Sequence, residues 1–146
     1  MPDAYLDGLR VEVRIEMWRS HLERSDARPL LVAVVDGVVV GFAVVGPEAR
    51  PDGAGARGEL YAMNLDPDHW GHGIGRALLR RSSAALAESG YDEAVLWVVP
   101  ENTRARSLYE SEGWRADGAV ATEEVLGVTV SEIRYRRVLA GASRAV

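Results

Sequence analysis

Three glycines at alternate positions, Gly71, Gly73 and Gly75, have the spacing in this sequence that points most directly to chemistry. They lie between the apolar segment 60–65, which an Asp-Pro pair follows, and an amphipathic run that begins at Ile74. Glycines let the chain turn tightly with its N–H groups facing one concavity, and a helix begins with unpaired N–H donors and a partial positive charge. The pattern predicts a site for an anion such as phosphate.

Two familiar nucleotide-binding patterns do not fit this loop. The dinucleotide fingerprint requires glycine at the sixth place counted from Gly71, where the chain has Arg76. The Walker pattern requires Gly-Lys followed by Ser or Thr, and the chain has Arg76-Ala77 there. An ordinary strand-to-helix turn without a ligand is an alternative that the loop alone leaves open.

The loop resembles the acyl-CoA loop of the GNAT N-acetyltransferase superfamily, whose core is Gln or Arg, two residues, Gly, one residue, then Gly or Ala. Trp70, Gly73 and Gly75 occupy these places, so Trp70 departs from the usual side chain. About 30 residues later, residues 102–114 resemble the second GNAT motif: Asn, a short helix ending in an aromatic-Glu pair, then Gly and an aromatic residue. The resemblance covers residues 29–138.

The resemblance implies two catalytic residues, and general chemistry says what each would do. Transfer of acetyl from a thioester to an amine needs loss of the amine proton, donors for the oxyanion and a proton for the departing thiolate. Tyr109 occupies the place where the family's tyrosine faces the CoA sulfur, and it is the candidate acid. Glu59, at the start of the central strand, is the candidate base, acting directly or through water. Core packing for Tyr109 and a solvated charge for Glu59 are the alternatives.

The resemblance also implies acetyl-CoA as the cosubstrate, with its diphosphate on the amides of the loop. In the family the central strand splays from its neighbour, and its free amides pair with the pantetheine arm. Asn102 is expected to bond that arm or the strand ends, or to cap the next helix. The expected cofactor-binding residues are Met63, Asn64, Leu65, Trp70, Gly71, His72, Gly73, Ile74, Gly75, Arg76 and Asn102. His69 and His72 are expected to be solvent-exposed, and the absence of paired ligand spacing predicts no metal site.

The elements that must hold these residues alternate between strands and helices. Asp36-Gly37 between two β-branched runs predicts a hairpin of strands 30–35 and 38–45, apolar enough to be covered on both faces. A surface loop, 46–57, should lead to the strand 60–65 and form a candidate rim of a substrate cleft.

After the glycine loop we expect a helix to Ser89, a strand over 94–99, a short helix with Thr103 as N-cap and a final strand over 128–138. Strand–helix–strand around the loop predicts a parallel pair, so the fold class is α/β: a GNAT-like mixed sheet with an antiparallel part and helices on both faces.

Residues 1–24 are expected to be helical, because Val11, Ile15, Trp18 and Leu22 form one stripe. The resemblance implies a first strand and helix before this segment, and we expect the chain to start too late to hold both. The strand 30–35 would then have a bare, apolar edge without lysine or internal proline, which predicts a homodimer or higher oligomer.

Length and composition fit a single acetyltransferase domain over residues 1–146. The net charge of −5 gives no reason to expect nucleic acid or an anionic membrane as a partner, and the absence of cysteine excludes a cysteine nucleophile. With no signal-like or membrane-length run, a cytoplasmic location is the default. The expected activity is direct, acetyl-CoA-dependent N-acetylation of a primary amine of a small molecule or peptide. The alternative is a non-catalytic acyl-CoA-binding or assembly module.

Overall fold

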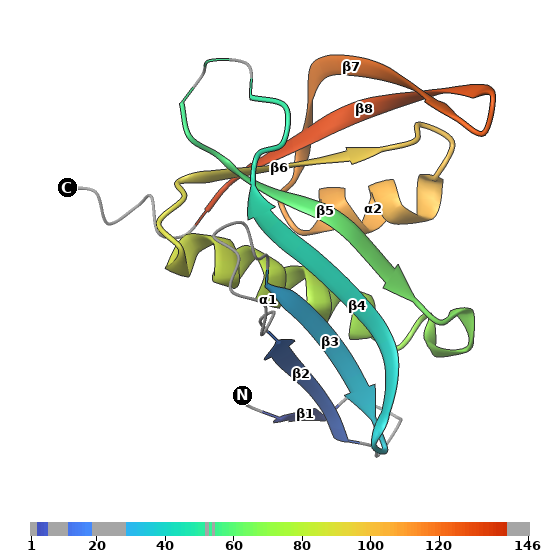
Figure 1. Ribbon diagram of the computed structural model, residues 1–146. Coiled ribbons are helices and arrows are strands. Elements are labelled where there is room, and N and C mark those ends of the chain that lie inside the picture. Colours follow the sequence, from blue (N-terminus) through green and yellow to red (C-terminus); the bar gives the residue numbers. More distant parts are fainter. Residues whose placement is uncertain (1–2, 6–11, 19–28, 52, 54, 140–146) are drawn as a thin grey trace.

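The computed structural model describes residues 3–5, 12–18, 29–51, 53 and 55–139, which form a mixed sheet and two α-helices (Figure 1). The strands lie side by side in the order β1-β2-β3-β4-β5-β6-β8-β7, and of these pairs only β5–β6 is parallel. The elements are β1 (Asp3–Tyr5), β2 (Glu12–Trp18), β3 (Leu30–Val35), β4 (Val38–Pro47), β5 (Gly58–Leu65), the 3-10 helix η1 (Pro67–His69), α1 (Ile74–Glu88), β6 (Glu93–Val98), α2 (Thr103–Ser111), β7 (Arg115–Val125) and β8 (Val128–Val138).

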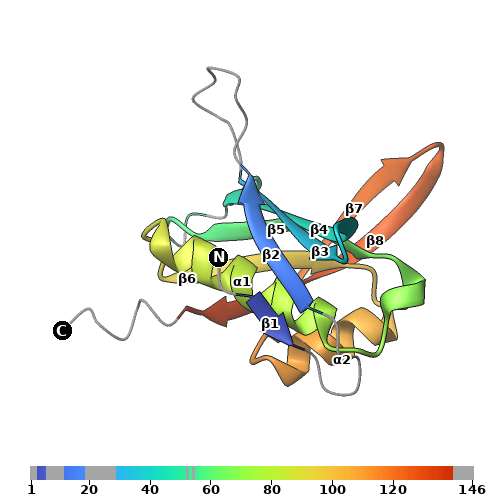
Figure 2. The same ribbon diagram turned by 90° about the horizontal axis from the view of Figure 1, so that it is seen from below.

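The core lies between the sheet and α1. Ile74, Leu78, Leu79 and Leu86 are buried on one face of α1, in one cluster with strand residues such as Leu31. Helix α2 lies on the same face of the sheet as α1 (Figures 1 and 2). The mixed α/β sheet is therefore confirmed, whereas helices on both faces are not found in the described part of the chain.

The hairpin prediction is confirmed. Asp36 and Gly37 both have positive φ, 51° and 78°, which is the turn geometry that matches the twist of paired strands. Coverage of both faces is only partly right, because Val38, Val39 and Phe42 of β4 are exposed.

The helix expected over residues 1–24 is wrong where the structure describes it, because β1 and β2 are strands. Val13 and Ile15 are buried and Arg14 between them is exposed, which is the period of two that a strand requires. The rest of that segment lies outside the described residues.

The bare edge expected for β3 is also wrong. Strand β2 pairs with β3 along its whole length, from Val13 opposite Val35 to Trp18 opposite Leu30. Strands β1 and β2 thus precede the hairpin. The reason given for a homodimer at this edge is lost.

Two further differences concern the second half of the chain. Strand β7, which the sequence did not predict, pairs with β8 through a turn in which Leu126 and Gly127 have positive φ. The N-cap of α2 is Asn102 rather than Thr103, because the Asn102 side chain accepts the Ala105 N–H at 3.2 Å. Neither helix in the described residues is both long and apolar enough to cross a membrane.

Candidate functional site

A gap between β5 and β6 forms the centre of the site. The two strands pair only from Gly58 to Leu60, although β5 continues to Leu65, and Figure 1 shows them diverging. The cause lies on the other side of β5, where Val44 faces Ala62 and Val45 faces Leu60, so Tyr61 is an extra residue. Such a bulge bends the strand that carries it. Beyond Leu60, the side of β5 that faces away from β4 has no strand partner among the described residues.

The glycine loop follows directly after this open strand. Gly71 and Gly73 have φ of 82° and 83°, a left-handed conformation that favours glycine. Gly73 is the N-cap of α1 and no side chain caps this end. The first N–H groups of α1 therefore have no intrahelical partner and face a ligand or solvent. Ile74 contributes through its backbone, because its side chain is fully buried in the core.

Trp70 is bonded to the end of β5. Its indole Nε1–H donates to the Leu65 carbonyl at 2.9 Å, and the ring is 44% exposed. Leu65 was expected to bind the pantetheine arm through its backbone. Its carbonyl oxygen already accepts a hydrogen bond from Trp70. Met63 and Asn64 lie beside it on the open part of β5. His72 is exposed as expected, whereas His69 is partly buried.

Tyr109 lies in the last turn of α2 with only 8% of its surface exposed. Its ring packs against Trp114 and Tyr135 at centroid distances of 6.4 and 6.1 Å. Tyr135 is itself fixed, because its hydroxyl donates to Glu110 at 2.5 Å and accepts from Arg106 at 2.9 Å. Burial raises the pKa of the Tyr109 phenol above its ordinary value, which keeps the hydroxyl protonated. That hydroxyl has no hydrogen-bond partner within the described part of the chain.

Glu59 is buried, with 6% of its surface exposed, and is not the solvated charge that a strand start suggests. Its Oε1 accepts the Ala49 N–H at 2.9 Å. Successive strand residues point to opposite faces, and Leu60 packs in the core on the helix face. The Glu59 carboxylate therefore lies on the face without the helices.

Glu59 and Tyr109 flank the start of the gap from opposite faces of the sheet. Leu60 is the last residue of β5 that pairs with β6, opposite Leu96, and Leu96 lies opposite Tyr135. The Tyr109 ring packs on Tyr135, and Glu59 immediately precedes Leu60. The structure thus brings both candidate catalytic residues to the place where the strands separate, without direct contact between them.

A buried charge network holds the loop between β4 and β5 over the face that carries Glu59. Arg57 makes a two-pronged ion pair with Glu48, both contacts being 3.1 Å, and the two side chains are almost fully buried. Arg134 bridges Glu48 at 3.6 Å and Asp117 at 2.7 Å. The Glu48 and Arg57 ends of the loop are therefore held to each other and to β8. Sequence spacing carries no signal for these contacts, since they join the two ends of the loop to residues of β7 and β8.

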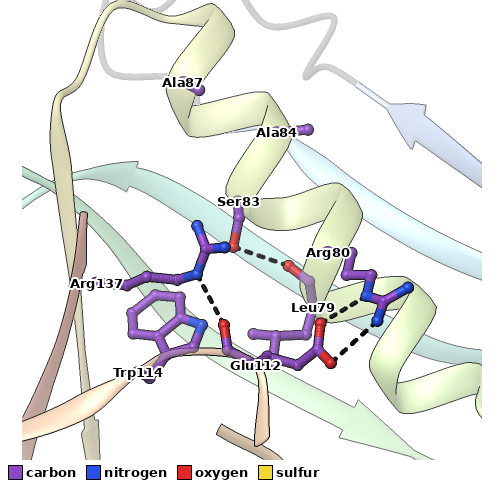
Figure 3. Close-up of a pocket in the computed structure, with 8 residues that line it drawn as sticks. All are labelled: Leu79, Arg80, Ser83, Ala84, Ala87, Glu112, Trp114 and Arg137. Carbon is purple, nitrogen blue, oxygen red and sulfur yellow. Dashed lines mark hydrogen bonds and ion pairs between the residues drawn. The ribbon is translucent and has the colours of Figure 1, made fainter. Parts of the chain in front are cut away.

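Arg76, expected at the cofactor, forms an ion pair with Glu112 at 3.3 Å, and Arg80 holds the same carboxylate at 2.5 Å. The hydrogen bond from Arg80, aided by the nearby charges of Arg80, Arg76 and Arg137, lowers the pKa of Glu112. Figure 3 shows this carboxylate at the wall of a pocket of about 370 Å³ between α1 and β8. The pocket contains none of the predicted site residues; its lining is Leu79, Arg80, Ser83, Ala84, Ala87, Glu112, Trp114 and Arg137.

The described residues contain no group of three or more His, Cys, Asp or Glu side chains that could hold a metal ion. Asn102, the remaining predicted residue, is exposed at the start of α2, where its oxygen serves the cap.

Comparisons with known proteins agree with this geometry. The model of the acetyltransferase (GNAT) family matches residues 2–114. The chain is 41% identical over 85 residues to the mycothiol acetyltransferase of Thermobispora bispora, covering 56% of this chain and 29% of that protein. It spans between 20% and 32% of the length of four mycothiol acetyltransferases to which it is similar.

Solved structures share the fold. A ribosomal-protein-alanine N-acetyltransferase from Brucella melitensis has a TM-score of 0.66 at 25% identity, covering 77% of this chain and 69% of that chain. A GNAT family acetyltransferase from Elizabethkingia anophelis with acetyl-CoA bound has a TM-score of 0.67 at 14% identity, with coverage of 87% and 98%. The second likeness concerns the fold alone.

Proposed function

The chain belongs to the GNAT acetyltransferase family, and from this membership we propose that it is an acetyl-CoA-dependent N-acetyltransferase. It would transfer the acetyl group directly to a primary amine of a small molecule or a peptide. The observation that carries the proposal is the gap between β5 and β6, with the glycine loop at one end and Glu59 and Tyr109 at the other.

The residues around the gap fit acetyl-CoA as a cosubstrate. The uncapped N-terminus of α1 offers N–H donors to a diphosphate, and the open side of β5 offers backbone groups to the amides of a pantetheine arm. The Tyr109 hydroxyl, without a partner in the structure, would then face the sulfur. Acetyl-CoA bound to a GNAT protein of the same fold supports this choice.

In the proposed transfer, the amine nitrogen attacks the thioester carbon, so that a C–N bond forms and the C–S bond breaks. Glu59 takes the proton that the amine loses, directly or through water, and Tyr109 gives its proton to the departing thiolate sulfur. An amine similar to lysine has a pKa of about 10.4, so a base is needed near neutral pH. The face that carries Glu59 would be the acceptor side, with the held ends of the loop at Glu48 and Arg57 beside it.

The proposal extends to the surroundings of the enzyme. We place the reaction in the cytoplasm. Because the chain is acidic overall, we expect neither nucleic acid nor an anionic membrane surface as a partner. A homodimer stays part of the proposal, although it now requires a surface other than the β3 edge.

The experiment is release of free thiol from acetyl-CoA, followed across a panel of amines, polyamines, amino acids and peptides, with calorimetry of CoA binding in parallel. We expect tight binding and turnover with at least one amine class. Binding without turnover against the whole panel would favour the non-catalytic module, and absence of binding would contradict both readings.

A further inference from the structure

Trp70 presents a flat, fixed surface beside the glycine loop. Its indole N–H is bonded to the Leu65 carbonyl, which limits rotation of the ring, and 44% of the residue stays exposed. An indole face attracts cations because its π-electrons are negative at the face. The ring is therefore a platform for a positive charge next to the first turn of α1.

Arg104, from the first turn of α2, occupies that platform. Its guanidinium carbon lies 4.4 Å from the centroid of the Trp70 ring. This contact joins two segments that are far apart in the sequence and brings a cation to the loop that precedes α1. Arg104 is exposed, so the contact leaves its N–H donors accessible to a ligand.

The charge of Arg104 is uncompensated, which distinguishes it from its neighbours. Arg76 and Arg80 both contact the carboxylate of Glu112, the Arg80 contacts being drawn in Figure 3. Among the residues that the structure describes, no carboxylate lies within ion-pair distance of Arg104. Of these three arginines, Arg104 is thus the one whose charge is still available to an anion.

We propose that Arg104, held on Trp70, is a binding residue for the diphosphate of the CoA cosubstrate. The guanidinium would meet the phosphate oxygens from the α2 side, while the amides at the start of α1 meet them from the loop side. A diphosphate fits better than a single carboxylate, because its two negative groups can engage both sets of donors at once. This inference rests on the proposed function and extends it to Arg104, a residue of the second motif that was not among the predicted site residues.

The test compares Arg104→Gln with the parent by calorimetry, using acetyl-CoA and S-acetylpantetheine, which lacks the diphosphate and the nucleotide. We expect Arg104→Gln to weaken acetyl-CoA binding about threefold to tenfold and to leave S-acetylpantetheine unchanged. Arg104→Lys keeps the charge but not the planar stack. Its affinity for acetyl-CoA should lie between that of the parent and that of Arg104→Gln. Arg136→Gln, which removes an exposed charge on β8, is the matched control and should bind as the parent does.

Trp70 tests the positioning part of the inference. Trp70→Leu removes the ring face and should weaken acetyl-CoA binding in the parent but add little to Arg104→Gln, because the two changes remove one interaction. Unchanged acetyl-CoA affinity in Arg104→Gln, or an equal loss for both ligands, would overturn the inference while leaving the proposed function in place. If the parent bound neither ligand, the proposed function itself would fail.

Discussion

Tyr109 combines a buried ring with an unpartnered hydroxyl, and this combination allows its chemistry to be tested apart from its packing. Tyr109→Phe keeps the ring contacts with Trp114 and Tyr135 and removes the acidic proton. Turnover should fall at least about tenfold, since general acid catalysis is typically worth about 10²–10⁴-fold, while CoA affinity persists. Steady-state rates and calorimetry measure the two effects separately.

The matched control is Tyr91→Phe, which removes a hydroxyl from a partly buried tyrosine outside the site. Because burial raises the pKa of Tyr109, the parent should lose no activity through this residue below its ordinary pKa of about 10. An unchanged rate in Tyr109→Phe would assign the residue to packing.

Glu59→Gln separates the proposed role of Glu59 as a base from its hydrogen bond to the loop. The amide oxygen of glutamine can still accept the Ala49 N–H, so the fold should persist, but the side chain can no longer take a proton. We expect a lower kcat/KM at neutral pH and partial recovery as pH rises toward the pKa of the amine. The measurement is the pH profile of the variant beside those of the parent and of Glu124→Gln, an exposed control on β7. A profile parallel to that of the parent would leave Glu59 with a structural role only.

The residues of the candidate site differ in how far the sequence predicts their positions and contacts. The place of the glycine loop follows from local spacing, because left-handed glycines and a helix start need only neighbouring residues. The burial of Glu59 depends on a loop fixed by Glu48, Arg57 and Arg134, and no local pattern shows those contacts. The stacking of Arg104 on Trp70 depends likewise on how two distant segments pack.

At the scale of the elements, α2 carries Tyr109 and Arg104, so its cap matters to both. Asn102 caps this helix through its oxygen, and its NH₂ group has no partner in the structure. Serine is also a good N-cap, whereas alanine costs about 1 kcal/mol. We therefore predict that Asn102→Ser keeps the melting temperature of the parent but binds CoA more weakly. Asn102→Ala should have both a lower melting temperature and a lower affinity for CoA. Parent-like affinity in the serine variant would restrict Asn102 to capping.

The elements that sequence missed have identifiable reasons. In β2 the apolar residues fit two templates, since Ile15 belongs both to a stripe of helical spacing and to an alternation with Val13 and Met17. The β-branched side chains and the charged residues between them favour the strand, which is the form observed. Strand β7 contains few large apolar residues, and its register shifts near Gly118, where φ is 91°. Its pattern is therefore weak.

At the scale of the whole molecule, the coverage of β3 changes what a proline should do there. Val32 lies in the interior of the sheet, between β2 and β4, so Val32→Pro removes a hydrogen-bond donor from paired strands. We expect a lower melting temperature, by thermal unfolding, and no change in the mass of the folded species, by light scattering. A folded variant that shifts from dimer to monomer would restore the β3 edge as an interface.

The parting of β5 from β6 has a consequence for how local stability is distributed. Beyond Leu60, amides on the open side of β5 have no strand partner among the described residues, whereas those that face β4 belong to a ladder that is interrupted at Tyr61. Hydrogen exchange along this one strand should therefore alternate between fast and slow positions in the free protein. A ligand whose own amides fill the opening would act as a short guest strand and slow the fast positions. Binding of such a ligand would raise the melting temperature by mass action. Part of the stability of the sheet would then come from the bound ligand.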